Sequence, residues 1–272
     1  MKPAPFRYHR PRSLADAVAL LSQYSDSKLI AGGQSLGPMM NMRLLQPAEL
    51  IDLNAVPGLD FITEKDDCLE IGALARHHAV SSSSSVKTCC PLLAEAAGTI
   101  GHYAIRSRGT LGGSLAHADP AAQLPLVAAT LGAQIVVHGR RGERRLAAKD
   151  FFVSMMSTAL APDEIVVSVR FPKAAAGDRH AYLQFSRRTG DFAIVAVAVV
   201  LHSQKFRLGI GGAEDKPLVF EGFSSKENPE AIARKVREAV DPAENPRVPA
   251  LYRKELVEVL VKRAVAKCLN SN

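Results

Sequence analysis

Two short glycine segments, residues 31–35 and 110–114, place the strongest constraint on how this chain folds. Each sets two adjacent glycines beside a hydroxyl side chain, and the first directly follows a strand-like stretch at 28–30. Glycine reaches backbone conformations in which consecutive N–H groups point into one concavity, and such concavities bind phosphate oxygens. A tight turn also explains either segment alone. The pair, about eighty residues apart, indicates two distant loops that contact one pyrophosphate from both sides.

Neither segment matches the common nucleotide-binding motifs. The G-x-G-x-x-G pattern of dinucleotide-binding folds and the G-x-x-x-x-G-K-[ST] pattern of P-loop proteins are both missing at these positions. The sequence therefore excludes a Rossmann fold and a P-loop as the source of this phosphate site.

Composition excludes several other classes of protein. Hydrophobic residues make up 47% of the 272 residues, which is enough for one large or two ordinary domains and rules out disorder across the chain. The longest apolar run, residues 192–201, is far shorter than the roughly 20 residues of a membrane-spanning helix. The N-terminus carries no apolar signal region, so a cytoplasmic location is expected. The net charge of +7 suits an anionic partner or cofactor, but dispersed basic residues argue against nucleic acid.

Hydrophobic periodicity predicts an α/β opening of about 55 residues. Ser13 and Asp16 form a capping box for a helix with Leu14, Val18 and Leu21 on its inner face. Strands are expected at 28–30 and 49–53, followed by a mixed middle region. That region is predicted to contain a strand-like stretch at 61–74, a serine-rich surface loop at 81–85, helices from 91 and over 124–131, and a hairpin of 134–138 with 144–146.

The last third of the sequence indicates a separate α+β domain. Four apolar stretches, at 165–171, 181–185, 192–201 and 205–210, predict an antiparallel meander. Helices are expected at 229–240 and 250–269, the second with Leu256, Leu260, Ala264 and Val265 on its inner face. The small-residue stretch at 174–177 is the candidate domain boundary.

Cysteines and histidines give no sign of a metal site in this chain. The cysteines at 68, 89, 90 and 268 lack the two-residue spacing that is typical of zinc and iron–sulfur ligands, so reduced structural thiols are expected. The adjacent His77 and His78 are predicted to be a surface pair, because neighbouring side chains on one element diverge. No pattern of nucleophile and base stands out, so no catalytic side chain is assigned.

Four charged or titratable residues flank the second glycine segment. For His102 and His117, the alternatives are a contact with the cofactor or a partner and a hydrogen bond to the backbone alone. For Arg106 and Arg108, they are neutralisation of a phosphate, contact with an acidic partner, and simple solvation. The sequence leaves these alternatives open.

The longer contexts, residues 31–44 and 105–120, resemble the FAD-binding medium subunit of molybdenum hydroxylases, the family of the carbon monoxide dehydrogenase medium subunit and the xanthine dehydrogenase flavin domain. The similarity covers nearly the whole chain, including 6–19, 163–165, 189–193 and 252–264. It implies an α+β fold with a two-subdomain FAD-binding region of the PCMH type at 1–56 and 57–173. A C-terminal flavoprotein domain at 174–272 follows.

The resemblance also implies roles for individual residues. The two glycine segments hold the FAD pyrophosphate through backbone N–H groups and hydroxyls, and Asp119 accepts hydrogen bonds from hydroxyls of the flavin chain. Leu160 packs near the flavin ring, and Phe192 lies by its other side, where stacking and ordinary core packing both remain open. The expected cofactor-binding set is Ala31, Gly32, Gly33, Gln34, Ser35, Leu36, Thr110, Leu111, Gly112, Gly113, Ser114, Asp119, Leu160 and Phe192.

Two residues depart from the family pattern. Gln123 stands where relatives commonly have an acid, and Gln184 stands where many have Lys. The affinity for FAD and the reduction potential of the flavin are therefore expected to differ from those of the relatives.

The implied function is electron transfer. The resemblance implies that FAD passes electrons from a separate small subunit with two [2Fe–2S] clusters to quinone, NAD or oxygen. Molybdenum–molybdopterin is expected on a large subunit, in a dimer of heterotrimers. An FAD-less scaffold or assembly factor with the same fold, and a stand-alone flavin oxidase, are the alternatives.

Overall fold

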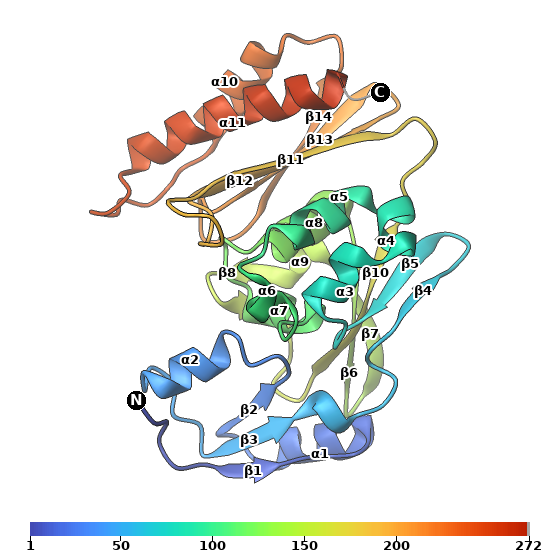
Figure 1. Cartoon of the computed structure of the whole chain (residues 1–272), viewed down its shortest axis with the longest axis vertical. Helices are drawn as coiled ribbons and strands as arrows, with labels where there is room; N and C mark the ends of the chain where they lie inside the picture. The colour runs from blue at the N-terminus through green and yellow to red at the C-terminus, as the bar shows by residue number, and fades with distance from the viewer. Residues whose placement is uncertain (271–272) are drawn as a thin grey trace.

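The computed structural model describes residues 1–270, which form three units stacked along the long axis of the molecule (Figure 1). The N-terminal unit lies at one end, and a larger unit of sheet and helices lies in the middle. The third unit, at the other end, carries the long C-terminal helix α11 (Ala250–Asn270).

A three-stranded parallel sheet, in the order β1–β3–β2, forms the N-terminal unit. Parallel strands need crossover connections, which α1 and α2 supply. The predicted cap of α1 is confirmed, since Ser13 Oγ accepts a 3.0 Å hydrogen bond from the Asp16 N–H. The elements are β1 (Arg7–His9), α1 (Leu14–Gln23), β2 (Ser27–Ile30), α2 (Leu36–Asn41), β3 (Glu49–Asp52) and the 3₁₀ turn η1 (Leu53–Ala55).

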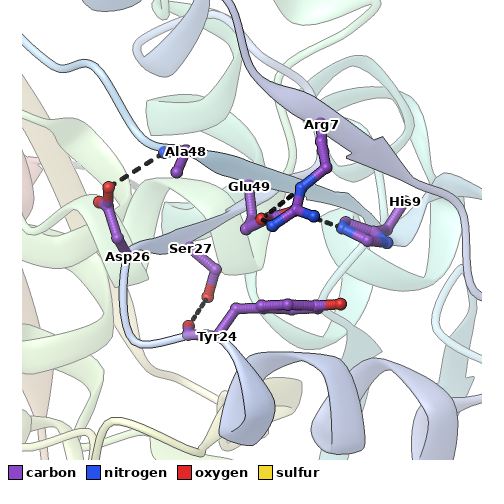
Figure 2. Close-up of polar contacts among 7 residues, drawn as sticks. All are labelled: Arg7, His9, Tyr24, Asp26, Ser27, Ala48 and Glu49. Carbon is purple, nitrogen blue, oxygen red and sulfur yellow. Dashed lines mark hydrogen bonds and ion pairs between the residues drawn. The ribbon is translucent and has the colours of Figure 1, made fainter.

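A buried carboxylate ties β1 to β3 (Figure 2). Glu49, only 2% exposed, accepts a 2.7 Å hydrogen bond from Arg7 Nε, and its other oxygen lies 2.6 Å from His9 Nε2. The Tyr24 ring stacks on His9 with 5.2 Å between centroids, and the Arg7 guanidinium lies 5.6 Å from its centre. Hydrogen bonds from His9 and Arg7 outweigh burial and lower the pKa of Glu49. Side-chain pairing thus reinforces a strand of only three residues.

The middle unit contains a five-stranded antiparallel sheet in the order β4–β5–β10–β6–β7. The predicted hairpin of 134–138 with 144–146 is confirmed as β6 and β7. The assignment of 165–171 to the C-terminal meander is wrong, because β10 is the central strand here, between β5 and β6. The strands are β4 (Ile62–Glu64), β5 (Cys68–Gly72), β6 (Gln134–Gly139), β7 (Gly142–Ala147) and β10 (Ile165–Pro172), with a separate hairpin of β8 (Phe152–Ser154) and β9 (Ser157–Thr158).

The predicted surface loop at 81–85 is wrong, because this stretch belongs to two short helices, α3 and α4. Val80 and Val86 are fully buried, and Ser83 Oγ caps α4 by accepting a 3.4 Å hydrogen bond from the Val86 N–H. Two buried valines on either side of five serines give little periodicity in the sequence. The helices of the unit are α3 (His77–Ser82), α4 (Ser84–Cys89), α5 (Pro91–Gly98), α6 (Tyr103–Arg106), α7 (Leu111–His117), α8 (Gln123–Leu131) and α9 (Ala148–Phe151).

Helix α8 joins the middle unit to the C-terminal unit. Its residues 123–130 are all buried, as in a helix that is covered on every side. Strand β13 (Lys205–Gly211) crosses it so closely that a Cβ at Gly209 would lie 1.9 Å from Thr130 Oγ1. Leu126 of α8 and Ala198 of the C-terminal sheet belong to one apolar cluster, so the two units share a core.

The C-terminal unit is an antiparallel meander, β11–β12–β13–β14, with both predicted helices on its outer face (Figure 1). The stretches at 181–185, 192–201 and 205–210 correspond to its first three strands, although β12 begins at Val195. Strand β14 was not predicted. The remaining elements are β11 (Arg179–Phe185), β12 (Val195–His202), β14 (Leu218–Ser224) and α10 (Pro229–Ala239).

Within residues 1–270, none of the helices combines the length and apolar character required to cross a membrane. The cysteines at 68, 89, 90 and 268 are all buried, and each is a free thiol that forms no disulfide.

The Glu49 pairing predicts a pH-dependent contribution to stability. A lowered folded pKa stabilises the fold above the unfolded carboxyl value of about 4.3, and this stabilisation is lost as pH falls through the folded value. We expect Glu49→Gln to lower the urea midpoint at pH 7, and the difference from wild type to shrink between about pH 5 and 3.

Glu238→Gln, at an exposed position of α10, is the matched control for this measurement. An unchanged urea midpoint for Glu49→Gln at pH 7 would contradict the role given to the pairing.

Candidate functional site

The two glycine segments, distant in sequence, meet between the N-terminal and middle units. A Cβ at Gly32 would lie 2.3 Å from the carbonyl oxygen of Arg108 and 2.8 Å from Gly109 Cα. Real side chains do not tolerate such distances, so this contact of two backbones requires glycine at position 32. The structure thus brings together the loops that the sequence paired.

The first segment presents unused hydrogen-bond donors. Gly33 has a φ of +68°, and the carbonyls of Gly33 and Ser35 accept from the first turns of α2. Within residues 1–270, the backbone N–H groups of Gly33, Gln34 and Ser35 donate to no other residue. Gln34 Nε2 donates at 2.9 Å to the Gly32 carbonyl. Ala31 and Leu36 flank the loop as half-buried residues. A row of free N–H groups in a half-buried loop is a site for an anion.

The second segment is more fully bonded within the protein. The N–H groups of Leu111 and Gly112 donate to the carbonyls of Ala75 and Ala73, at 3.0 and 2.8 Å. Thr110 accepts from Gly113 N–H through its hydroxyl at 3.2 Å, and from Ser114 N–H through its carbonyl at 3.0 Å. The parts of this segment that remain accessible at the surface are the exposed backbone of Gly113 and the half-buried side chain of Ser114. Free N–H donors are therefore concentrated in the first segment.

The other predicted site residues surround α6 and α7. Asp119 is half-buried just after α7 and accepts a 2.8 Å hydrogen bond from the Ala121 N–H. Leu160 follows the β8–β9 hairpin, which is tied to the end of α7 by a 3.0 Å bond from Met156 N–H to the Ala118 carbonyl. Phe192 is 59% exposed in the loop before β12, which excludes the core-packing alternative.

His102 and Arg106 contribute to the same region through local contacts. The His102 ring lies against Gly190, where a Cβ would be 2.9 Å from its Cε1, so it joins α6 to the loop that carries Phe192. Arg106 Nη1 donates to the carbonyls of Ile100 and Gly101, both at 2.9 Å. His117 is half-buried in the last turn of α7, and the exposed Arg108 side chain bonds no other residue among 1–270.

The prediction of a surface histidine pair is wrong for His77, although His78 is exposed. His77 Nε2 lies 2.9 Å from the Thr110 carbonyl, which makes Nε2 the donor, and its buried Nδ1 has no partner among the described residues. Burial lowers the pKa of His77 to about 4, so the ring is neutral at physiological pH. It packs directly behind Gly109.

Three residues at this site were not identified from the sequence: Asn54, Arg76 and His77. Asn54 bonds Ala31 in the first segment, and Arg76 bonds Arg108 just ahead of the second, at sequence separations of 23 and 32 residues. No local pattern marks such pairs.

The two departures from the family pattern contact each other. Gln123 is 4% exposed, and its Nε2 donates at 3.2 Å to Gln184 Oε1. The same oxygen accepts from the Tyr182 hydroxyl at 2.8 Å and from Thr99 Oγ1 at 3.3 Å. A neutral hydrogen-bonded pair thus joins α8 to β11 at this position.

A double-mutant cycle tests this pair. Gln123→Glu buries a carboxylate, and Gln184→Lys replaces an acceptor of three hydrogen bonds with a cation, so each is expected to lower the free energy of unfolding by about 1–3 kcal/mol. The double variant forms an ion pair and is expected to recover at least half of the summed loss.

Urea denaturation measures the cycle, with Gln134→Glu at an exposed position of β6 as the control. Strictly additive losses in the double variant would contradict the coupling.

Comparisons with known proteins give this site a family. A model described as the FAD binding domain in molybdopterin dehydrogenase matches residues 4–174, and one described as the CO dehydrogenase flavoprotein C-terminal domain matches residues 180–268. The free donors of the first segment and the glycine contact between the loops fit the diphosphate of FAD.

The similarity to individual relatives extends over nearly their full lengths. The chain is 39% identical over 280 residues to the nicotine 6-hydroxylase medium subunit of Paenarthrobacter nicotinovorans, with 98% of each covered. It is 38% identical over 285 residues to the 6-hydroxypseudooxynicotine dehydrogenase complex subunit alpha of the same organism, which covers 99% of this chain and 96% of that protein. The structure of carbon monoxide dehydrogenase from Hydrogenophaga pseudoflava that lacks the Mo-pyranopterin moiety superposes with a TM-score of 0.94 at 37% identity, covering 98% of both chains. Because two family models, full-length relatives and a solved structure all match, the chain belongs to the FAD-binding medium subunits of the molybdenum hydroxylases, a family of oxidoreductases.

Proposed function

We propose that this chain holds FAD across its two glycine segments and relays electrons between partner iron–sulfur clusters and an external acceptor. The observation that carries the proposal is the meeting of the segments at Gly32, beside the free N–H groups of Gly33, Gln34 and Ser35. These groups would hold the pyrophosphate of FAD from the N-terminal unit. Ser114 and the exposed backbone of Gly113 would approach it from the middle unit.

Other residues of the expected set would position the remainder of the cofactor. Asp119 has a second carboxylate oxygen for a ribityl or ribose hydroxyl, and Leu160 offers an apolar surface to the flavin ring. The exposed Phe192 would stack on that ring, because stacking removes the phenyl group and the flavin face from water. FAD, when bound, supplies the redox chemistry, and the protein supplies binding, orientation and electrostatics.

We further propose the partner arrangement. The relatives are subunits of multi-subunit enzymes, as the words "medium subunit" and "complex subunit" in their names state. A large molybdenum–molybdopterin subunit and a small subunit with two [2Fe–2S] clusters would complete the enzyme, as a dimer of heterotrimers. Residues 1–56, 57–173 and 174–272 would act as two FAD-binding subdomains and a C-terminal domain. Quinone, NAD and oxygen are the candidate acceptors.

The direct test is the flavin content of the purified full-length chain. We expect about one FAD per chain, identified by chromatography after denaturation, either as purified or after incubation with FAD. A colourless protein that takes up no FAD, alone or with its partner subunits, would contradict the proposal and favour the scaffold alternative.

A pair of glycine variants tests the location of the site. Gly32→Ala places a methyl group 2.3 Å from the Arg108 carbonyl oxygen, whereas Gly37→Ala meets no atom within 4 Å. Overpacking of about 1–3 kcal/mol should weaken FAD binding by about fivefold to a hundredfold in Gly32→Ala, as measured by flavin fluorescence titration. Equal affinities in the two variants would place the cofactor elsewhere.

A further inference from the structure

We propose that Asn54, Arg76 and His77 form a clamp that holds the two glycine segments at the separation needed for FAD, and that they are positioning residues for the cofactor. This inference rests on the proposed function. None of the three belongs to the expected binding set. They are defined here together as the interloop clamp.

The first part of the interloop clamp is a series of three hydrogen bonds between the segments. Asn54 Nδ2 donates at 2.8 Å to the Ala31 carbonyl, at the start of the first segment. Arg76 Nη2 donates at 2.7 Å to Asn54 Oδ1, and Arg76 Nη1 donates to the Arg108 carbonyl ahead of the second segment. The backbone of one loop is thereby linked to the backbone of the other through two side chains.

Neighbouring contacts fix the orientation of the Asn54 amide. Its Nδ2 also donates to Asp52 Oδ1, whose carboxylate additionally accepts from the Asn54 N–H at 2.9 Å. With both Nδ2 protons directed at acceptor oxygens, the amide oxygen is the group that faces Arg76. Both polar atoms of the Asn54 side-chain amide therefore have partners.

The second part of the interloop clamp is the dipeptide of Arg76 and His77, which binds three consecutive carbonyls. Arg76 Nη1 binds the carbonyl of Arg108, His77 N–H binds that of Gly109 at 2.9 Å, and His77 Nε2 binds that of Thr110 at 2.9 Å. These three bonds hold the backbone of residues 108–110 against Arg76 and His77, and so fix the position at which the second segment begins.

Charge complementarity supports the same conclusion. The Arg76 guanidinium donates to an amide and a carbonyl, and within residues 1–270 no carboxylate lies within ion-pair distance of it. Asp52, the acid of this network, bonds Asn54 and Tyr8 instead. A cation that keeps its charge unneutralised beside the junction of two loops favours a dianionic ligand there.

The experiment measures FAD affinity and apoprotein stability of the full-length chain for Arg76→Gln, Asn54→Ala and the double variant. Each single change breaks the same series of bonds, so we expect FAD binding about tenfold to a hundredfold weaker for each. The double variant should bind FAD only slightly more weakly than either single variant, because one substitution already breaks the connection between the two loops. The thermal midpoint of the apoprotein should stay close to that of wild type, because the loss is expected in FAD binding and not in folding.

Two further arginine variants separate position from charge. Arg108→Gln removes a nearby positive charge but leaves the Arg108 carbonyl in the clamp, so its loss of affinity should be clearly smaller than that of Arg76→Gln. Arg234→Gln, at an exposed site on α10, is the remote control and should bind FAD like wild type. If Arg76→Gln does not fold, Asn54→Ala breaks the same series from the surface-exposed side and carries the test.

Each outcome decides the proposal. Wild-type affinity in Arg76→Gln and Asn54→Ala, losses that multiply in the double variant, or equal losses for Arg108→Gln and Arg76→Gln would overturn the interloop clamp while leaving FAD binding intact. A wild-type chain that binds no FAD would instead overturn the proposed function, so the two failures are distinguishable.

Discussion

The backbones of two loops touch where Gly32, after β2, meets Arg108, between α6 and α7, and no side chain fits between them. This contact sets the position of the N-terminal unit on the middle unit, and with it the width of the space beside the glycine segments. Around it lie Arg76, Arg106 and Arg108, whose guanidinium groups have only neutral acceptors or none among residues 1–270. Part of the net charge of +7 is thus gathered around the loop contact, although the sequence shows it only as dispersed residues.

The remaining architecture provides a rigid support for this contact. Helix α8 packs against α5, α7 and β10 of the middle unit and against β12 and β13 of the C-terminal sheet, so the C-terminal unit and the middle unit share one core. The C-terminal unit in turn carries the loop with Phe192, and His102 fixes that loop to the start of α6. The loop that bears the exposed Phe192 is therefore anchored by Gly190 on one side and by the buried Ala193 on the other.

Local patterns in the sequence predicted local structure well. The Ser13 cap, the hairpin of β6 and β7 and the helices α10 and α11 each depend on residues a few positions apart, so their signals were readable. Strand β10 was misplaced because an apolar run does not say which strands flank it. The serines of α3 and α4 and the burial of His77 depend on packing against distant residues. The family motifs located the two loops, but not the side chains that connect them.

The three units are joined to one another by very unequal amounts of apolar surface. The N-terminal unit packs on the back of the middle sheet through a small cluster that includes Val18, Leu53 and Ile165, whereas the other two units share the main core. Local opening follows the weakest packing, so amide hydrogens of the N-terminal sheet should exchange through an opening of that unit alone. The interloop clamp and the contact at Gly32 lie at the boundary that such an opening would separate.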